Sequence, residues 1–358
     1  MNFIRNVSLQ RHKTAGLVIH IMEMKQEITE PAVLGIGNAL VDVINVLEDD
    51  SILEEFGLRR GSMTLVGDDL SKKIFEMTHD NKREITTGGS AANTIHALAA
   101  LGAECGYIGK IGDDILGQNF RIEFEKKNIK THLFISHKDT GRVMALVSPD
   151  SERTMATYLG AAADLKPKEL TLEIFNNYSV LFIEGYLVQD HKLIEKAIDL
   201  AREAGLQIAI DLSSYNVVEA NLDFLRKLIR EKVDIVFANE EEAYAFTGKQ
   251  PEEALTEIAG LCEIAVVKVG KSGSLIQRGN EVVRTGIVPA KAIDTTGAGD
   301  AYAAGFLYGL TKGYTLAISS RIAALVSSRV VEVMGAKIPE ILWPEINKAI
   351  KKMIQNNP

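Results

Sequence analysis

Short apolar runs alternate with longer segments of helical spacing through the second half of the chain. The gaps between these runs place apolar residues three and four positions apart, as on one face of a helix. Alternation of strands and helices at these lengths predicts a doubly wound α/β fold, with a mostly parallel central sheet flanked by helices. The runs predicted as strands are Val180–Glu184, Gln207–Leu212, Asp234–Ala238 and Ala265–Val269.

The first half of the chain has the same elements in a less regular order. A helix is predicted to open near Ser90 and to end before Gly102, because small and apolar residues fill the segment and glycine follows it. The other elements predicted here are a strand from Ala32 to Gly37, a strand from Cys105 to Ile108 and a helix from Ile115 to Lys127.

Two stretches, about 43–66 and 131–159, break this alternation with extended segments. In the second stretch, Pro149-Asp150 lies between the runs Gly141–Ser148 and Arg153–Tyr158, which is a hairpin pattern. We therefore predict that the two stretches together form one small β-sheet, a lid that covers the site.

Composition limits the class of protein. The chain has 358 residues, 46% of them hydrophobic and 25% charged, which is typical of a globular protein with one large domain over about 31–350. Residues 1–30 differ, with no acid before Glu23, and are predicted to be an extension outside that domain. The formal net charge of −8 argues against a nucleic acid or an anionic membrane as partner. Only Cys105 and Cys262 are present, and no apolar run is long enough to span a bilayer, so a cytoplasmic location is expected.

The most informative motif is the sequence DTTGAGD at 294–300, followed by a small-residue apolar segment from Ala301 to Leu310. That segment predicts a buried helix, and glycines at its start can turn its free amide groups and positive dipole end toward an anion. Asp300 places a carboxylate at this anion site. A general base that takes a proton from a hydroxyl attacking phosphorus would stand there. The alternative is a glycine turn with an aspartate helix cap.

Two other glycine motifs do not hold. Residues 269–273, VGKSG, resemble the end of a phosphate-binding P-loop, but Ala265 occupies the position of its first glycine and a hairpin follows instead of a helix. Residues 35–40, GIGNAL, resemble a dinucleotide-binding motif, but Leu40 replaces the third glycine. A nicotinamide-dependent enzyme is therefore disfavoured. A nucleotide-binding regulator without catalysis is also disfavoured, because Asp300 and the glycines before it are intact.

Four segments together resemble the ribokinase-like (PfkB) carbohydrate kinases. GGSAAN at 88–93 is similar to the family's N-terminal motif, and residues 294–300 are similar to its C-terminal motif. NEEE at 239–242 resembles its Asn-x-x-Glu motif, and residues 268–273 resemble its nucleotide-loop strand. The resemblance covers roughly 31–340 in the family's order and implies an ATP-dependent kinase with a central sheet and a small β-sheet lid.

The resemblance also implies a role for each matching residue. Asp300 would be the catalytic base, with the transferring phosphoryl group held by the backbone of Gly297, Ala298 and Gly299. Asp42 would bind vicinal hydroxyls of the substrate, since a carboxylate can accept two hydrogen bonds. Glu184 ends a strand at the crevice where ligands bind in such sheets. The full set of predicted substrate-binding residues is Asn38, Asp42, Gly88, Gly89, Asn93 and Glu184.

On the nucleotide side, the resemblance implies Mg²⁺ bound with ATP and organised through water by Glu242. Several members of the family also use K⁺ beside the anion site, where Asp294 is the predicted ligand, with Thr296 and Gly335 nearby. Lys268 stands where the family often has threonine. The predicted nucleotide-binding residues are Asn239, Lys268, Gly270, Gly273 and Thr295.

The spacing Asn38-Ala-Leu-Val-Asp42 resembles the adenosine kinase branch of the family. The expected acceptor is therefore the 5′ hydroxyl of a nucleoside, best adenosine, and the alternative is a free sugar such as ribose, fructose or 2-keto-3-deoxygluconate. An adenine would need an apolar slot under the lid. Candidate walls are Leu40, Val143, Met144, Met155 and Tyr158, of which strand alternation turns only about half inward. The chain is expected to act as a monomer or as a homodimer formed through the lid.

Overall fold

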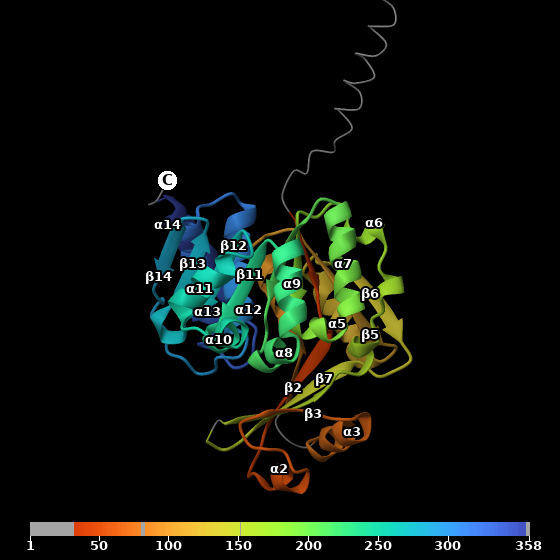
Figure 1. Ribbon diagram of the computed structural model, residues 1–358. Coiled ribbons are helices and arrows are strands. Elements are labelled where there is room, and N and C mark those ends of the chain that lie inside the picture. Colours follow the sequence, from red (N-terminus) through yellow and green to blue (C-terminus); the bar gives the residue numbers. More distant parts are fainter. Residues whose placement is uncertain (1–31, 80–82, 151, 356–358) are drawn as a thin grey trace, which may run out of the picture.

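The computed structural model describes residues 32–79, 83–150 and 152–355. Within these residues the strands form two sheets, one of nine strands and one of five. Figure 1 shows the larger sheet between layers of helices, with the smaller sheet projecting below it. The predicted extension 1–30 lies outside the described residues.

The large sheet follows the predicted alternation. Strands β9 to β12 are parallel neighbours, β1 pairs with β9 and β5, and a terminal β13–β14 hairpin runs antiparallel. Parallel strands need crossover connections, and helices provide them here. In spatial order the strands are β14 (Glu281–Thr285), β13 (Ser274–Arg278), β12 (Ile264–Lys268), β11 (Ile235–Asn239), β10 (Gln207–Asp211), β9 (Val180–Glu184), β1 (Val33–Ile36), β5 (Cys105–Gly112) and β6 (Lys130–Ser136).

Helices cover both faces of this sheet, and each face has its own hydrophobic core. One core contains residues of α4 (Ser90–Ala100), α5 (Ile115–Lys126), α12 (Ala298–Thr311), α13 (Leu316–Val330) and α14 (Trp343–Gln355). The other contains residues of α7 (His191–Glu203), α8 (Tyr215–Ala220), α9 (Leu222–Lys232), α10 (Glu240–Thr247) and α11 (Pro251–Ala259), with the short α6 (Leu172–Phe175). The fold is therefore doubly wound, as predicted. Helix α14 runs to Gln355, past the predicted boundary at 350.

The five-stranded sheet lies in the order β3 (Met63–Leu65), β8 (Arg153–Tyr158), β7 (Gly141–Val147), β2 (Leu40–Val46) and β4 (Arg83–Gly88). One of its faces packs in a core with Leu53 and Ile74, which belong to α2 (Ser51–Glu55) and α3 (Asp68–Met77). We call this sheet with α2 and α3 the small-sheet module. Neither helix was predicted.

The predicted extent of this sheet needs two corrections. Strand β6, which lies in the predicted stretch 131–159 except for its first residue, pairs with β5 at the edge of the large sheet. It follows α5 in a β-α-β unit, so the crossover returns it beside β5 in parallel. Strand β4, outside both predicted stretches, pairs with β2 instead. The predicted β7–β8 hairpin around Pro149-Asp150 is present.

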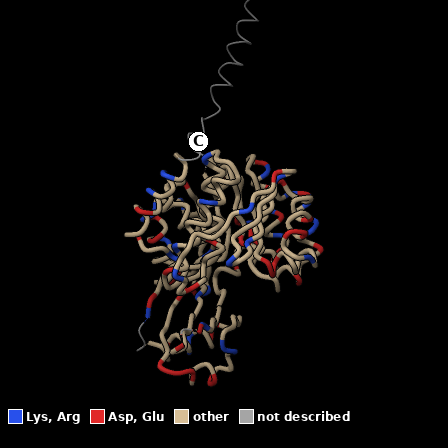
Figure 2. The backbone as a smooth tube through the Cα atoms, turned by 90° about the vertical axis from the view of Figure 1, so that its left-hand side faces the viewer, with Lys and Arg blue, Asp and Glu red and all other residues tan. Residues whose placement is uncertain are grey.

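Figure 2 shows that basic and acidic positions are intermixed along the backbone. No helix in the part of the chain that the structure describes is long and apolar enough to cross a bilayer.

The turn from β4 into α4 depends on two glycines. Gly89 has φ +97°, and a Cβ atom there would lie 2.1 Å from the carbonyl oxygen of Asn38. A Cβ atom on Gly88 would lie 2.4 Å from the Asp42 carboxylate. The absence of side chains thus lets the start of α4 approach the β1–β2 connection and Asp42.

We expect Gly89→Ala to destabilise the fold more than Gly102→Ala, a matched change after the same helix. Gly102 also has positive φ, +88°, but a Cβ atom there meets nothing within 4 Å. The control should lose about 1–3 kcal/mol from backbone strain alone. Gly89→Ala should lose more, because the backbone must also shift. Denaturant unfolding of both variants measures this, and equal losses would contradict the steric explanation.

Candidate active site

The N-terminus of α12 is built as predicted from residues 294–300. Gly297 precedes the helix with φ +74°, and a Cβ atom there would lie 2.5 Å from Cβ of Ala336. The Ala298 amide donates to the carbonyl of Thr295 at 3.1 Å. The amides of Gly299 and Asp300 lie in the first helical turn and have no acceptor within the helix. They, together with the positive end of the helix dipole, form a site for an anion.

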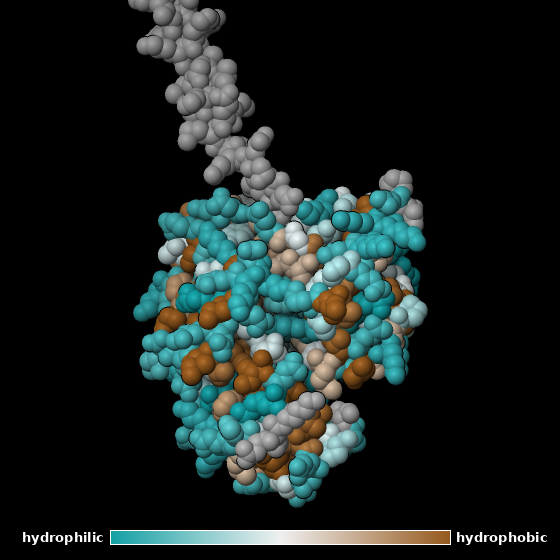
Figure 3. Space-filling view, turned by 180° about the vertical axis from the view of Figure 1, so that it is seen from behind, coloured by the Kyte–Doolittle hydropathy of each residue, from teal (hydrophilic) through white to brown (hydrophobic). Residues whose placement is uncertain are grey.

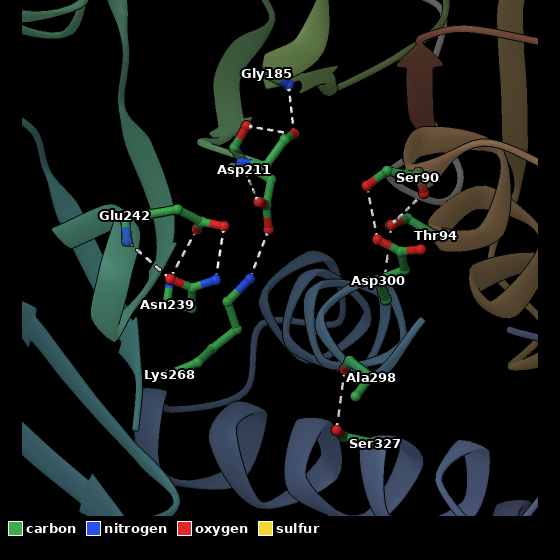
Figure 4. A network of polar contacts seen from close by, with 11 residues as sticks. Ser90, Thr94, Gly185, Asp211, Asn239, Glu242, Lys268, Ala298, Asp300 and Ser327 are labelled. Carbon is green, nitrogen blue, oxygen red and sulfur yellow. Dashed lines mark hydrogen bonds and ion pairs between the residues drawn. The ribbon is translucent and has the colours of Figure 1, made fainter. Parts of the chain in front are cut away.

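Asp300 is held in place by the start of α4 (Figure 4). Its Oδ1 accepts a hydrogen bond from Ser90 Oγ at 2.7 Å, and its Oδ2 accepts one from Asn93 Nδ2 at 2.9 Å. Thr94 Oγ1 donates to the backbone carbonyl of Asp300 at 3.3 Å. Burial raises the pKa of Asp300 to about 6, against the opposing effect of Ser90 and Asn93. A carboxylate with a raised pKa is a better proton acceptor near neutral pH.

Asp42 lies on β2 beside Gly88. Burial raises the pKa of Asp42 to about 6, and the charge of Asp300 adds to this, while Lys337 and Arg153 oppose it. The two carboxylates are thus close enough to influence each other. Hydroxyl groups between them could donate to Asp42 and to the second lone pairs of the Asp300 oxygens.

Asn93 has a buried oxygen without a partner. The residue is 8% exposed, its Nδ2 donates to Asp300, and its Oδ1 has no hydrogen-bond partner in the structure. Such an atom costs free energy unless a ligand or water donates to it. The contact between Asn93 and substrate stays a prediction.

Glu184 does not reach the substrate side directly, contrary to its predicted role. It is 1% exposed; Oε1 accepts from Nδ2 of Asn38 at 2.6 Å, and Oε2 accepts from the amide of Ala91 at 3.0 Å. Burial raises the pKa of Glu184 to about 7. The strand does end at the crevice, but the β1–β2 connection and α4 cover the carboxylate. Asn38 is also buried, 5% exposed, and its side-chain amide donates to Glu184.

A cavity of about 740 Å³ extends from Asp300 and Ser90 along the ends of the neighbouring strands. Its polar end contains Lys268 and Asp211, and its other end is mostly apolar, formed by the segment 287–292 and by α13. Predicted residues that line the cavity are Asn239, Glu242, Lys268, Gly270, Gly273, Thr295, Ala298, Gly299 and Asp300. A cavity of this size can hold a nucleotide.

Lys268 is paired with a carboxylate that was not predicted. Its Nζ donates to Asp211 Oδ2 at 2.8 Å, and a Cβ atom on Gly299 would lie 3.1 Å from that Nζ. Burial by itself would lower the pKa of Lys268, but Asp211, Glu242 and Asp300 outweigh it and raise the pKa. The ammonium group is therefore charged and stands beside the anion site. Asp211 could have been found from the sequence, because it is the second-last residue of a predicted strand.

Asn239 and Glu242 form the two halves of a capping box at the start of α10. The Asn239 amide donates to Glu242 Oε2 at 2.8 Å and its Nδ2 donates to Oε1 at 2.7 Å, while the Glu242 amide donates to Asn239 Oδ1 at 2.8 Å. Burial and the charge of Asp211 raise the pKa of Glu242 to about 7.

These carboxylates suit a metal only through water. The described residues include no group of three or more histidine, cysteine or acidic side chains placed to hold an ion. Each Glu242 oxygen already accepts one hydrogen bond and keeps a second lone pair, which can accept a proton of a metal-bound water. Mg²⁺ keeps several waters and takes its remaining ligands from phosphates. Glu242 and Asp211 therefore fit Mg²⁺ bound with a nucleotide.

Comparison with known proteins identifies the family of this chain. Residues 62–342 match the model of the pfkB family carbohydrate kinases. The chain belongs to this family.

It is 35% identical to a solved adenosine kinase from Sinorhizobium meliloti, with a TM-score of 0.80 over 90% of this chain and 99% of that one. A probable sugar kinase from Rhizobium etli is 30% identical, with a TM-score of 0.81 over 90% and 98%. A 5-dehydro-2-deoxygluconokinase from Geobacillus kaustophilus is 30% identical over 64% of this chain and 74% of the relative. This pfkB kinase is thus a phosphotransferase that acts on a sugar or a nucleoside.

We expect Asp300→Asn to reduce turnover on the order of 10²–10⁴-fold, the usual effect of losing a positioned general base. Asparagine keeps the shape and one acceptor oxygen, so nucleotide affinity should stay near the wild-type value. Calorimetric titration with a non-hydrolysable ATP analogue and an ADP-release assay separate the two effects. Wild-type turnover in the variant would refute the role of Asp300.

The pH dependence follows from the raised pKa values. Asp300 accepts a proton only when ionised, so kcat/KM should fall as the pH drops through about 6. The pKa of Asp42 is also raised to about 6, so kcat/KM should fall more steeply with decreasing pH if the ionised form of Asp42 binds the acceptor. A pH–rate profile measures the slope. A flat profile through this range would contradict the assignment.

Proposed function

We propose that the pfkB kinase transfers the γ-phosphate of ATP to the 5′ hydroxyl of a nucleoside, with adenosine as the best acceptor. The Asp300 carboxylate would take the hydroxyl proton while the new O–P bond forms and the bond to ADP breaks. The Gly299 and Asp300 amides would stabilise charge on the transferring group. Mg²⁺, held by the phosphates and by water on Glu242, would neutralise phosphate charge.

The observation that carries the nucleoside assignment is an apolar sheet face that continues outward from Asp42. Register places Asp42 opposite Val143, and Ile44 opposite Ala145, on the same face of the small sheet. Ala145 in turn lies opposite Met155 on β8. Ile44, Ala145 and Val147 pack together as a separate apolar cluster. Beside this cluster, Val143 and Met155 on the same face are only half-buried and can cover a base, and burying an adenine against them would add a few kcal/mol of binding at about 25 cal/mol per Å².

Strand alternation divides the candidate walls between the two faces. Val143 and Met155 share the face of Asp42, whereas Met144 is fully buried on the opposite face. Tyr158 also points away, because it pairs with Arg142 and lies 5.4 Å beneath that guanidinium group.

The outer part of the apolar face is open. Val46 is 47% exposed, and Met63 and Leu65 on the edge strand β3 are 49% and 56% exposed. Figure 3 shows hydrophobic surface gathered on the small-sheet module at the lower end of the molecule. A free sugar would fill only the region near Asp42, whereas a nucleoside would also cover part of this surface. Whether the face also joins two chains in a lid-mediated homodimer stays a prediction.

The second candidate is a free-sugar kinase, which the similarity to the 5-dehydro-2-deoxygluconokinase favours. Free ribose offers the same hydroxyls to Asp42 and Asp300 as adenosine does. The two functions therefore differ in the use of the apolar face and not in the catalytic groups.

The test is ADP release with adenosine, inosine, ribose, fructose and 2-keto-3-deoxygluconate at matched concentrations. We expect the highest kcat/KM with adenosine and loss of all activity on chelation of Mg²⁺. Met155→Gln should raise the KM for adenosine about tenfold, the effect of weakening an apolar contact by about 1.4 kcal/mol. Met77→Gln, on α3 and 52% exposed, is the matched control and should leave the KM unchanged. If a free sugar gives the highest kcat/KM and adenosine is inert, the nucleoside assignment is wrong and the kinase assignment stands.

A further inference from the structure

The segments expected to hold K⁺ do come together in the structure. Thr296 donates to Asp294 Oδ1 through its amide at 3.0 Å and through its hydroxyl at 2.8 Å. The amide of Gly335 donates to Asp294 Oδ2 at 2.6 Å. Residues 294–297 and 335–336 thus form two loops in contact with each other, here called the loop pair.

The Asp294 carboxylate is nevertheless already paired with a cation from the protein. Arg153 Nη1 lies 2.8 Å from Asp294 Oδ2 and donates to Thr296 Oγ1 at 3.0 Å. The other terminal nitrogen of Arg153 contacts Met334. Both side chains of the pair are nearly buried, with 12% of Arg153 and 6% of Asp294 exposed.

These contacts leave no place for a metal cation on this carboxylate. Its two oxygens accept three hydrogen bonds, from Thr296 and Gly335, and Oδ2 also forms the ion pair with Arg153. A K⁺ ion here would have to displace a donor and would lie against the positive charge of Arg153, in a partly buried setting where repulsion is strong. The predicted K⁺ ligand Asp294 therefore does not fit K⁺ in this chain.

We propose that the Arg153 guanidinium supplies, from within the chain, the positive charge that a monovalent cation would supply beside the anion site. Arg153 opens β8 of the small-sheet module, and Asp294 opens the loop that ends in Asp300. The pair is thus a direct link between the sheet that covers the acceptor and the helix start that holds the phosphoryl group.

The surrounding packing makes this link tight. A Cβ atom on Gly297 would touch Ala336, and one on Gly335 would lie 3.4 Å from Cδ1 of Ile44 on the small sheet. The loop pair therefore lies between the anion site and the apolar face. Arg153 is a positioning residue, and its removal should loosen the geometry of the anion site. The inference depends on the kinase reaction but not on which acceptor is correct.

The first measurement uses the unmodified enzyme with whichever acceptor is most active. ADP release and the melting temperature are compared in potassium, sodium and choline chloride at equal ionic strength. We expect kcat to change by less than about twofold, within the range of general salt effects, and the melting temperature to be equal in the three salts. Several-fold stimulation by K⁺ would overturn the proposal.

The second measurement uses Arg153→Met, which keeps the length and apolar stem of the side chain. We expect kcat to fall about 10- to 100-fold, as misplacement of reacting groups does, with a smaller change in KM. Added guanidinium or K⁺ should then restore part of kcat in the variant while leaving the wild type unaffected. Arg60→Met is the matched control, because Arg60 lies in the small-sheet module but pairs with Asp50 and Asp150 at the surface.

Each other result counts against the proposal. Wild-type kcat in Arg153→Met would show that the charge is not needed. A loss that neither guanidinium nor K⁺ reduces would show that Arg153 acts only through packing of the small sheet. A loss of the same size in Arg60→Met would assign the effect to general destabilisation of the module. Absence of kinase activity with every acceptor would instead refute the proposed function and is read from the wild type alone.

Discussion

The placement of Asp300 beside a helix start depends on compensation of its buried charge. An uncompensated carboxylate near other acids would take up a proton or move away from them. Here Ser90 and Asn93 donate to its two oxygens, and Asp300 lies in the first turn of α12, where the helix dipole favours a negative charge. The cost of burial is only partly offset, and the pKa stays raised. Incomplete compensation of this kind keeps a carboxylate ready to accept a proton.

The same principle organises the neighbouring groups. Glu184 is satisfied by Asn38 and by the amide of Ala91, and so fixes the start of α4 against β1. Glu242 is satisfied by Asn239, and Lys268 by Asp211. These buried charges bind helix starts and strand ends together along one edge of the parallel sheet. The polar network thus determines how the helix starts and strand ends meet, and the catalytic geometry follows from it.

The small-sheet module is joined to this network from the other side. Its inner face presents Asp42 and a row of apolar side chains, and Arg153 at the start of β8 pairs with Asp294. The small-sheet module and the start of α12 are therefore connected at two places. One is the turn from β4 into α4, whose Ser90 contacts Asp300, and the other is the Arg153–Asp294 pair. The loop pair 294–297 with 335–336 packs between the module and this helix start.

The sequence by itself determined the doubly wound fold and the helix start at 294–300, because periodicity and glycine placement are local properties of the chain. It also indicated Asp42, Gly89, Asn239 and Asp300 as parts of one site, through the resemblance of short motifs. It could not assign β4 and β6 to their sheets, since strand partners are chosen by packing between distant segments. Only the tertiary structure decided which residues meet: the Lys268–Asp211 and Arg153–Asp294 pairs join residues far apart in the chain. It also decided that Glu184 lies behind the site, because burial depends on which segments cover a strand end, and no local pattern encodes that.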